Sequence, residues 1–378
     1  MTTASIQEGQ QRRSLRDRAL GLLIQLALAV FIFGWLLPRY IDYEEAWNAI
    51  KGLSWWELLV LLAFSVARVP TEAMIYRALL PGLHLRVGSE AYLSQNFAGL
   101  LPPPASSVVQ YAYFRSDRFE RRPSLIGAVG SFIFPTAGRM VMPLVAVALL
   151  VLTGNFNPEA IWIVAASLVI LLVAAAIIWL VGRSDASALW VGNQSGRAIS
   201  WVLAMVHKQP VTGLGDLLVN FRKHIYTTVK ERWVRGSIAV SLNLFLTFVL
   251  LLLSVRFVGL SNDELPWSEV FAALAVGFFA GSVLPLTSSG VGTSDAIIIA
   301  ALSAMSGNAS LSAAGEITWR VFYSFLALPI GVFTLGRFRK KHGELLTDAW
   351  TALAEMRESG NGDNAGTPKE LSASATPN

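Results

Sequence analysis

The sequence of 378 residues contains no cysteine and only four histidines. The absence of cysteine excludes disulfide bonds, thiolate metal sites and cysteine nucleophiles. The histidines are scattered through basic segments, and no group of His, Asp and Glu has the spacing of metal ligands, so we expect no metal and no cofactor. Charged residues are also scarce, at 15% of the chain compared with about 25% in a soluble domain. This scarcity argues against a soluble protein.

Hydrophobic residues are abundant instead, at 54% of the chain, and the mean hydropathy is +0.52. This composition predicts an all-α polytopic membrane protein, organised as one membrane domain with short connectors. The net charge is +5, but the positions of the Lys and Arg residues are more informative, because these residues gather in cytoplasmic connectors. We therefore expect a multi-pass membrane protein with no nucleic-acid partner.

Apolar stretches long enough to cross a bilayer occur six times along the chain. The first is too long for the apolar part of a signal peptide, and no small-residue cleavage site follows it, so we expect it to be retained. Because basic residues mark the connectors that stay inside, both termini are expected in the cytoplasm. The six predicted full spans are residues 19–37, 55–80, 125–152, 161–181, 237–257 and 317–335.

The placement of charge also divides the chain into segments. Two membrane halves are separated by a long basic connector, and polar residues rich in Gly, Ser, Thr and Pro form the end of the chain. We expect a cytoplasmic basic N-terminus at 1–18, a first membrane half at 19–182, a cytoplasmic basic connector at 183–236, a second membrane half at 237–341 and a largely disordered cytoplasmic tail at 342–378.

Two further apolar regions, 90–114 and 267–306, are each divided by proline into stretches too short to span. Arginines lie on both sides of the first region, whereas the flanks of the second, at 261–265 and 306–316, hold no Lys or Arg. A re-entrant hairpin enters and leaves through the same face, so its two flanks share one side of the membrane. The first hairpin is therefore expected to enter from the cytoplasm and the second from outside.

The two hairpins contain a repeated stretch. Residues 97–109 and 279–291 align without a gap at an offset of 182 and share seven identities, including Pro103/Pro285. Broken helices at corresponding places in two halves are typical of transporters with an inverted-topology repeat, whose binding site lies near the bilayer midplane. The alternative is chance similarity between two ordinary helix breaks.

Two arginines follow the two hairpins. Arg139 and Arg320 lie in the next spans, 181 residues apart, where they would face the hairpin tips and attract an anionic headgroup. Free amides where a helix restarts near Thr293 would add to that attraction. The alternative is that both arginines pair with Asp295, Glu316 or backbone carbonyls and only hold helices together.

Other candidate site residues surround these arginines in the predicted topology. Arg68 and Glu72 are four residues apart in the second span, where they can pair on one helix face and must face the interior of the bundle or a cavity. Ion coupling would need a titratable group at the midplane, for which Glu72, Asp295 and Glu316 are the candidates. The hairpin tips add hydroxyls that could bond phosphate oxygens (Ser106, Ser107, Ser288, Ser289) and helix breakers (Pro103, Pro285, Gly290, Gly292).

The second hairpin also follows a family pattern. Leu284-Pro285 are followed by Gly290, Gly292 and Asp295, with Arg320 in the next span. Residues 20–340 thereby resemble the transmembrane family named after lysylphosphatidylglycerol synthase, also called the flippase-like domain family. Its motif Leu-Pro-x-x-Pro-Gly-Gly-x-Gly-x-x-Glu precedes a short helix, and an Arg lies in the span after it.

This sequence departs from the family pattern at several positions. Asp295 stands where Glu is usual, Ser288-Ser289 replace Pro-Gly, and Gln110 stands where the family often has an Arg before an aromatic-rich run. The resemblance implies lipid translocation, or at least membrane-lipid handling, in a bacterial or archaeal inner membrane. Lysine transfer is not expected, because no soluble aminoacyl-transfer domain follows the membrane region.

Three functions are compatible with these features. The leading hypothesis is a transporter that moves an anionic phospholipid or a polyprenyl-phosphate-linked lipid between leaflets. A non-transporting scaffold of an envelope-synthesis complex would use the basic segment 183–236. An intramembrane enzyme acting on a lipid phosphate would use Asp295 or Glu316 as a base, but no nucleophile–base spacing stands out and no His lies in a span. We therefore expect no catalytic activity, and we leave open whether the chain forms a homodimer.

Overall fold

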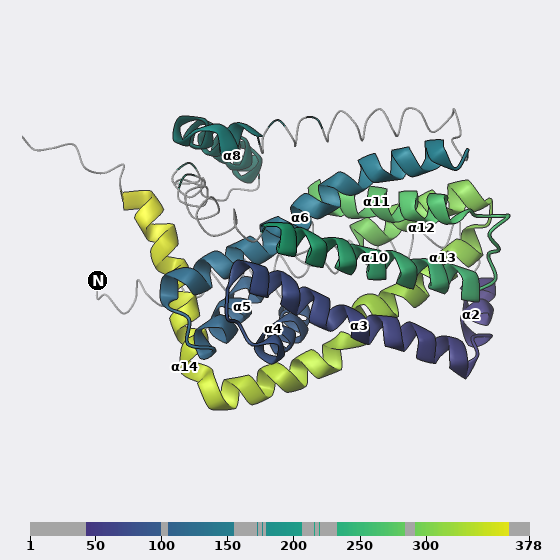
Figure 1. Cartoon of the computed structure of the whole chain (residues 1–378), viewed down its shortest axis with the longest axis horizontal. Helices are drawn as coiled ribbons and strands as arrows, with labels where there is room; N and C mark the ends of the chain where they lie inside the picture. Colours follow the sequence, from purple (N-terminus) through teal and green to yellow (C-terminus); the bar gives the residue numbers. More distant parts are fainter. Residues whose placement is uncertain are drawn as a thin grey trace, which may run out of the picture. The chain divides into compact units, whose positions relative to one another are not determined.

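The computed structural model describes residues 43–99, 105–154, 179–205, 233–283 and 292–362, together with positions 172, 176, 215 and 219. These described residues form helices joined by short turns, and no strand occurs among them (Figure 1). The chain divides into two compact units. Unit 1 comprises Met1–Ala174 and Thr228–Leu346, and unit 2 comprises Ala175–Thr227 and Thr347–Asn378.

Four stretches of the described residues are helical, long and apolar enough to cross a membrane: α3 (Trp55–Leu79), α6 (Arg121–Leu152), α10 (Trp233–Phe257) and the run Ala309–Thr351. They coincide with four of the six predicted spans, so the prediction of apolar helices of membrane-spanning length is confirmed for these four. The predicted span 19–37 lies outside the described residues, and so does most of the span 161–181.

Two pairs of shorter helices occupy the predicted hairpins. The first pair is α4 (Leu85–Ala98) and α5 (Ala105–Ser116), and the second is α11 (Trp267–Val283) and α12 (Thr293–Ser306). The helices of each pair pack against each other. α4 begins 182 residues before α11, which is the offset of the sequence repeat. The two breaks, at residues 100–104 and 284–291, lie outside the described residues.

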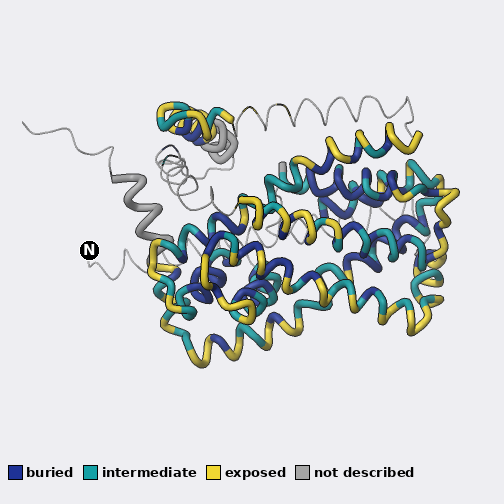
Figure 2. The backbone as a smooth tube through the Cα atoms, in the orientation of Figure 1, coloured by how far each residue is buried: buried dark blue, intermediate teal, exposed yellow. Residues whose placement is uncertain are grey.

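Within unit 1, α3 and α10 form the central pair. They run antiparallel, because Asn243 donates a hydrogen bond to Thr71 Oγ1 (2.8 Å) and Gly236 lies beside Ala78. Figure 1 shows α4 and α5 at one end of this pair and α11 and α12 towards the other. α6 packs against both α5 and α11 and so connects the two ends. Figure 2 shows that buried residues gather along both helix pairs.

The helix ends have local causes. Ser54 and Glu57 form a capping box: Ser54 Oγ accepts from the Glu57 amide (3.4 Å), and Glu57 Oε2 accepts from the Ser54 amide (2.7 Å). α3 therefore begins at Trp55, which is 71% exposed as an interfacial tryptophan would be. α11 and α12 can approach closely at Gly277 because glycine has no side chain. A Cβ atom at this position would lie 2.3 Å from Ile298 Cγ1.

Several segments differ from the prediction. The segment 38–54, which separates the first two predicted spans, contains a helix, α2 (Tyr43–Lys51), whose Ala46 is buried against α13. The cation-free segment 306–316 is largely helical, because α13 (Ala309–Arg320) starts there under an N-cap in which Asn308 Oδ1 accepts from the Leu311 amide (2.9 Å).

The last predicted span is longer and less regular than expected. α13 continues through a π-helical turn, η4 (Val321–Phe325), into α14 (Ala327–Gly362), which is kinked at His342. α14 therefore includes residues 342–362 of the tail that we expected to be largely disordered, and residues 363–378 lie outside the described part of the chain. In unit 2, α8 (Asp185–Met205) lies in the predicted basic connector.

Candidate anion-binding site

Unit 1 contains a cluster of charged side chains, although most residues of the chain are apolar. The cluster contains three cations and three carboxylates from four helices. All of them are buried except one arginine, Arg139, which is half-buried. The positive charges of Arg68 and Arg139 lie close enough to Arg320 to repel its own, and Glu72 lies close enough to Arg139 to attract it. The members are Arg68 and Glu72 of α3, Arg139 of α6, Asp295 of α12, and Glu316 and Arg320 of α13.

Arg320 is the most fully paired cation of the cluster. Its Nη2 forms an ion pair with Asp295 Oδ1 and donates a hydrogen bond to Ser294 Oγ (3.2 Å). Its Nε lies 3.6 Å from Glu316 Oε1, one helical turn earlier. The side chains of these three charged residues are at most 5% exposed. Arg320 therefore makes the contacts that the helix-holding alternative anticipates.

Asp295 has two functions at the start of α12. Besides pairing with Arg320, its Oδ2 accepts a hydrogen bond from the Gly292 amide (2.9 Å). Gly292 has φ +97°, a conformation that side-chain-bearing residues rarely adopt. The carboxylate of Asp295 therefore caps the Gly292 amide, and the prediction of free amides near Thr293 stays a prediction.

Arg68 and Glu72 do not form a direct ion pair in the described structure, contrary to our expectation. Arg68 instead donates from Nη1 to the Tyr323 carbonyl (3.2 Å), stacks on the Tyr323 ring at 4.0 Å and interacts with the Tyr92 hydroxyl. The positive charges of both Arg68 and Arg139 attract the Glu72 carboxylate. Arg68 is thus held mainly by a backbone carbonyl and an aromatic ring.

Arg139 differs from the other two arginines. Its guanidinium lies over the Phe278 ring at 4.9 Å, and its buried Nε–H has no hydrogen-bond acceptor. Among the described residues, Arg139 makes no hydrogen bond and no ion pair at salt-bridge distance. It is therefore the cation of the cluster whose donors remain available for an added anion.

Aromatic rings line the cluster, and sequence reasoning missed them. Trp319 and Tyr323 stack at 4.5 Å, and the Arg320 guanidinium lies 4.8 Å from the Trp319 ring centre. Phe278 lies 6.0 Å from the same two rings. The signal available in the sequence was the spacing of Arg320 and Tyr323, because residues three apart share a helix face.

The residues predicted at the hairpin tips are only partly described. Ser106 and Ser107 are half-buried in the first turn of α5. The remaining tip residues, Pro103, Pro285, Ser288, Ser289 and Gly290, lie outside the described residues. The predicted contact between these tips and a headgroup therefore stays a prediction.

The first half of the chain contains a buried network of neutral polar groups. Gln110 Nε2 donates to Tyr76 Oη (3.1 Å) and to Gln95 Oε1, and Gln110 Oε1 accepts from Ser131 Oγ (2.7 Å). Gln110 is the residue that stands where the resembled family often has an Arg. Here it connects α3, α4, α5 and α6 without any charge.

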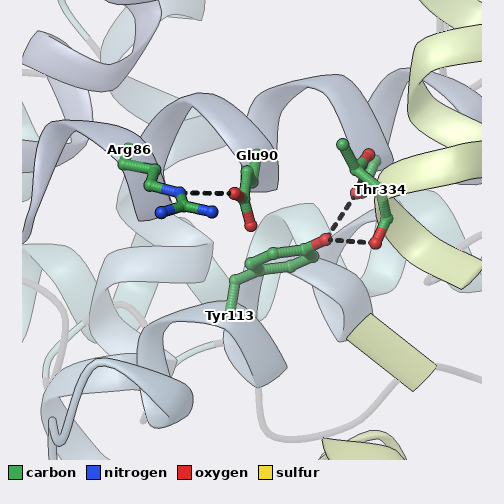
Figure 3. A network of polar contacts seen from close by, with 5 residues as sticks. Arg86, Glu90, Tyr113 and Thr334 are labelled. Atoms are coloured by element: carbon green, nitrogen blue, oxygen red, sulfur yellow. Dashed lines mark hydrogen bonds and ion pairs between the residues drawn. The ribbon is translucent and has the colours of Figure 1, made fainter. Parts of the chain in front are cut away.

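A second neutral contact joins the first hairpin to α14 (Figure 3). Tyr113 Oη and Ser94 Oγ lie 2.8 Å apart, and Tyr113 Oη donates to the Thr334 carbonyl (3.1 Å). Ser94 Oγ also lies 2.8 Å from Thr334 Oγ1. The Tyr113 ring stacks on Phe338 at 4.0 Å. We call these residues (Ser94, Tyr113, Thr334 and Phe338) the α4–α14 latch.

A hollow of about 500 Å³ also lies along α10, lined by residues such as Trp233, Ile238, Leu242 and Phe245. Its lining contains no charged side chain, so it is not a candidate anion site. Within the described residues, no group of three His, Asp or Glu side chains is placed to hold a metal ion. The sequence matches no protein-family model and no curated protein.

Proposed function

We propose that the protein is an integral membrane lipid transporter of the flippase-like kind, which moves an anionic phospholipid or a polyprenyl-phosphate-linked lipid between leaflets. The observation that carries this proposal is Arg139. An arginine inside a membrane domain is costly unless it has a partner or water. Among the described residues, Arg139 contacts an aromatic ring, its Nε–H has no acceptor, and the Glu72 carboxylate acts on it only through its charge.

A phosphate would supply the acceptors that Arg139 lacks. Guanidinium groups bind phosphate oxygens through charge-assisted and often bidentate hydrogen bonds. Arg68 and Arg320 would add positive potential nearby, while their own donors bind Tyr323 and Asp295. We therefore assign the direct phosphate contact to Arg139, and a supporting electrostatic function to Arg68 and Arg320.

The helix arrangement is compatible with alternating access. The order of a long helix, two short helices and a further long helix occurs twice, and the short pairs lie at opposite ends of unit 1 (Figure 1). An inverted-topology repeat with two re-entrant hairpins would produce this arrangement and would place a site near the bilayer midplane. We propose that topology in an inner membrane, with both termini in the cytoplasm.

Leaflet exchange in proteoliposomes tests the proposal. Labelled phosphatidylglycerol, phosphatidylethanolamine and a polyprenyl phosphate would each be offered to the wild-type protein and to Arg139→Ala. We expect exchange of an anionic lipid by the wild type and its loss in Arg139→Ala, with both proteins monodisperse. Arg235→Ala is the matched control, because Arg235 is an exposed arginine near the start of α10. Wild-type exchange that persists in Arg139→Ala would refute the assignment.

A non-transporting membrane scaffold is the second candidate, and the pairing of Arg320 favours it. Arg320, Asp295 and Glu316 connect α12 to α13 through buried ionic contacts, which a purely structural function would also need. The scaffold predicts no lipid exchange by the wild type, together with a stable partner recovered from native membranes. An enzymatic function has less support, because Asp295 binds Arg320 and the Gly292 amide, and Glu316 forms an ion pair with Arg320 at 3.6 Å.

A further inference from the structure

Glu316 is a buried carboxylate of the cluster that is held by a single, long ion pair. Its side chain is 2% exposed, and its Oε1 accepts no hydrogen bond in the described structure. Its closest cationic atom is Arg320 Nε at 3.6 Å, beyond hydrogen-bond distance. Asp295, by contrast, binds both Arg320 Nη2 and the Gly292 amide. The Arg320 guanidinium therefore binds Asp295 closely and Glu316 only at a longer distance.

The charges around Glu316 come from several packed elements. The cationic groups are Arg320 on its own helix, Arg68 of α3 and Arg139 of α6; the carboxylates are Asp295 of α12 and Glu72 of α3. η4 adds the titratable hydroxyl of Tyr323. The other helices packed on α12 and α13 carry charges at their ends: Arg235 and Arg256 on α10, Glu269 on α11, and Glu44, Glu45 and Lys51 on α2.

This environment favours a neutral Glu316. A buried carboxylate without a hydrogen-bond donor is unfavourable, and uptake of a proton removes the charge. We propose that Glu316 is a proton-binding site whose protonation is coupled to binding of the anionic lipid at Arg139. This inference rests on the proposed transport function and adds its energy source.

The coupling follows from the local charge. When Glu316 is protonated, Arg320 pairs with Asp295 alone, the cluster of three cations retains two carboxylates, and a phosphate anion restores neutrality at Arg139. When Glu316 loses its proton, the carboxylate attracts Arg320 and the cluster no longer needs the phosphate. One proton and one singly charged lipid therefore enter and leave together, which is electroneutral symport.

A structural element next to Arg320 can support two arrangements. The π-helical turn η4 begins at Val321, and the Leu326 amide donates to the Val321 carbonyl (2.8 Å). Single π-helical turns carry one extra residue in a helix and frequently lie at functional sites. A shift of this extra residue along the helix would turn Arg320 and Tyr323 relative to α12. The contacts of Tyr323 with Arg68 and Trp319 would then change together.

Infrared spectroscopy tests the proton site without requiring transport. Difference spectra between acidic and alkaline pH would be recorded for the full chain in detergent. We expect a protonated-carboxyl band that disappears in Glu316→Gln and shifts in Glu316→Asp, which keeps a titratable group if the Gln variant does not fold. Glu264→Gln is the matched control, because Glu264 is exposed and bonds to Ser261 outside the cluster. A band unchanged in both Glu316 variants would overturn the proposal.

Proteoliposomes with a pH gradient test the coupling. The probe would be labelled phosphatidylglycerol, with a trapped pH indicator to follow protons. For one proton per lipid, a gradient of one pH unit should sustain about a tenfold concentration difference of labelled lipid between the leaflets. Glu316→Gln should abolish both this difference and the proton movement, whereas Glu264→Gln should match the wild type.

The two proposals fail in different ways. Wild-type exchange that ignores the gradient and moves no protons would overturn the coupling and leave the transport function standing. No exchange of any anionic lipid by the wild type would refute the transport function and, with it, the coupling. The infrared band would then decide whether Glu316 binds a proton as a structural group.

Discussion

The two halves of the chain build the same sequence of helices but connect them with different chemistry. In the first half, Gln110 and its partners form a network of neutral hydrogen bonds that joins α3, α4, α5 and α6. In the second half, Asp295, Glu316 and Arg320 connect the corresponding helices through charges. A repeated backbone arrangement therefore does not imply repeated electrostatics.

Corresponding positions make the contrast specific. At the repeat offset of 182 residues, Asp295 corresponds to Tyr113. In the α4–α14 latch, Tyr113 forms hydrogen bonds with Ser94 and Thr334, whereas Asp295 binds Arg320 and caps α12. Neutral hydrogen bonds each contribute about 1 kcal/mol and do not respond to a proton or an anion near neutral pH. A charged network responds to both, which is why we place the proton-binding site in the second half.

Among the substitutions that test this contrast, Asp295→Ala is expected to lower the free energy of unfolding the most. The substitution leaves the Arg320 guanidinium buried without its close carboxylate, and breaking a buried ion pair on one side costs about 3–5 kcal/mol. The unfolding free energy in detergent should fall by that amount, measured by denaturant titration of the purified protein.

A double variant serves as the control for this prediction. Asp295→Leu combined with Arg320→Met removes both charges and should recover most of the lost stability, because well-packed apolar residues often replace a buried ion pair without loss. Lipid exchange should remain impaired, because the positive charge of Arg320 that supports phosphate binding is absent. If Asp295→Ala alone unfolds at the wild-type midpoint, the ion pair does not hold α12 to α13.

A smaller effect is expected in the neutral half. Gln110→Met keeps a similar volume but removes the hydrogen bonds to Tyr76, Gln95 and Ser131. Ser131 keeps the Ala128 carbonyl as an acceptor, whereas Gln95 Oε1 loses the donor Gln110 Nε2. Unsatisfied buried polar groups cost about 1–3 kcal/mol, so the thermal midpoint should fall less than in Asp295→Ala. The pH dependence of stability should not change, because none of the groups involved is charged. A new pH dependence in Gln110→Met would contradict the comparison.

The α4–α14 latch should contribute still less. Tyr113→Phe removes the hydroxyl that bonds Ser94 and Thr334 while keeping the ring that stacks on Phe338. We expect a loss of about 1 kcal/mol, the usual contribution of one neutral hydrogen bond. A double-mutant cycle with Ser94→Ala isolates the bond. A coupling energy near zero would show that stacking alone holds the latch.

Much of the fold could be predicted because hydropathy determines which segments become long helices. α3, α6 and α10 begin and end within four residues of the predicted spans. The prolines predicted the division of both hairpins, although α4 ends at Ala98, before the prolines. The helices α2 and the start of α13 were missed because their hydrophobic faces are made of small residues such as Ala46, Ala313 and Ala314.

The candidate site was predictable only in part. The i,i+4 spacing of Glu316 and Arg320 predicts their proximity, and Asp295 was correctly named as an alternative partner. The contact of Arg68 with Tyr323 could not be predicted, because it joins residues 255 positions apart and depends on how α3 meets η4. The different environments of Arg139 and Arg320 likewise depend on packing, although the sequence presents the two arginines as equivalents.

The smallest effect is expected at Glu264, an exposed carboxylate in the connector between α10 and α11. Its Oε2 accepts from the amide and the hydroxyl of Ser261 (2.9 and 2.8 Å), and these bonds lower the pKa of Glu264. A carboxyl whose pKa falls on folding stabilises the folded loop above its unfolded-state pKa, and this contribution is lost as pH falls through the folded-state pKa. Ser261→Ala removes the hydroxyl bond, so the pKa should rise towards that of an ordinary glutamate.

Hydrogen exchange of the peptide 258–266 measures this effect. Protection of this peptide should fade at a higher pH in Ser261→Ala than in the wild type, and Glu264→Gln should show no such step because it cannot titrate. Equal midpoints in the wild type and Ser261→Ala would contradict the prediction. The result sharpens the contrast with Glu316: two donors keep Glu264 ionised at the surface, whereas Glu316 Oε1 lacks a donor and is buried, which favours a bound proton.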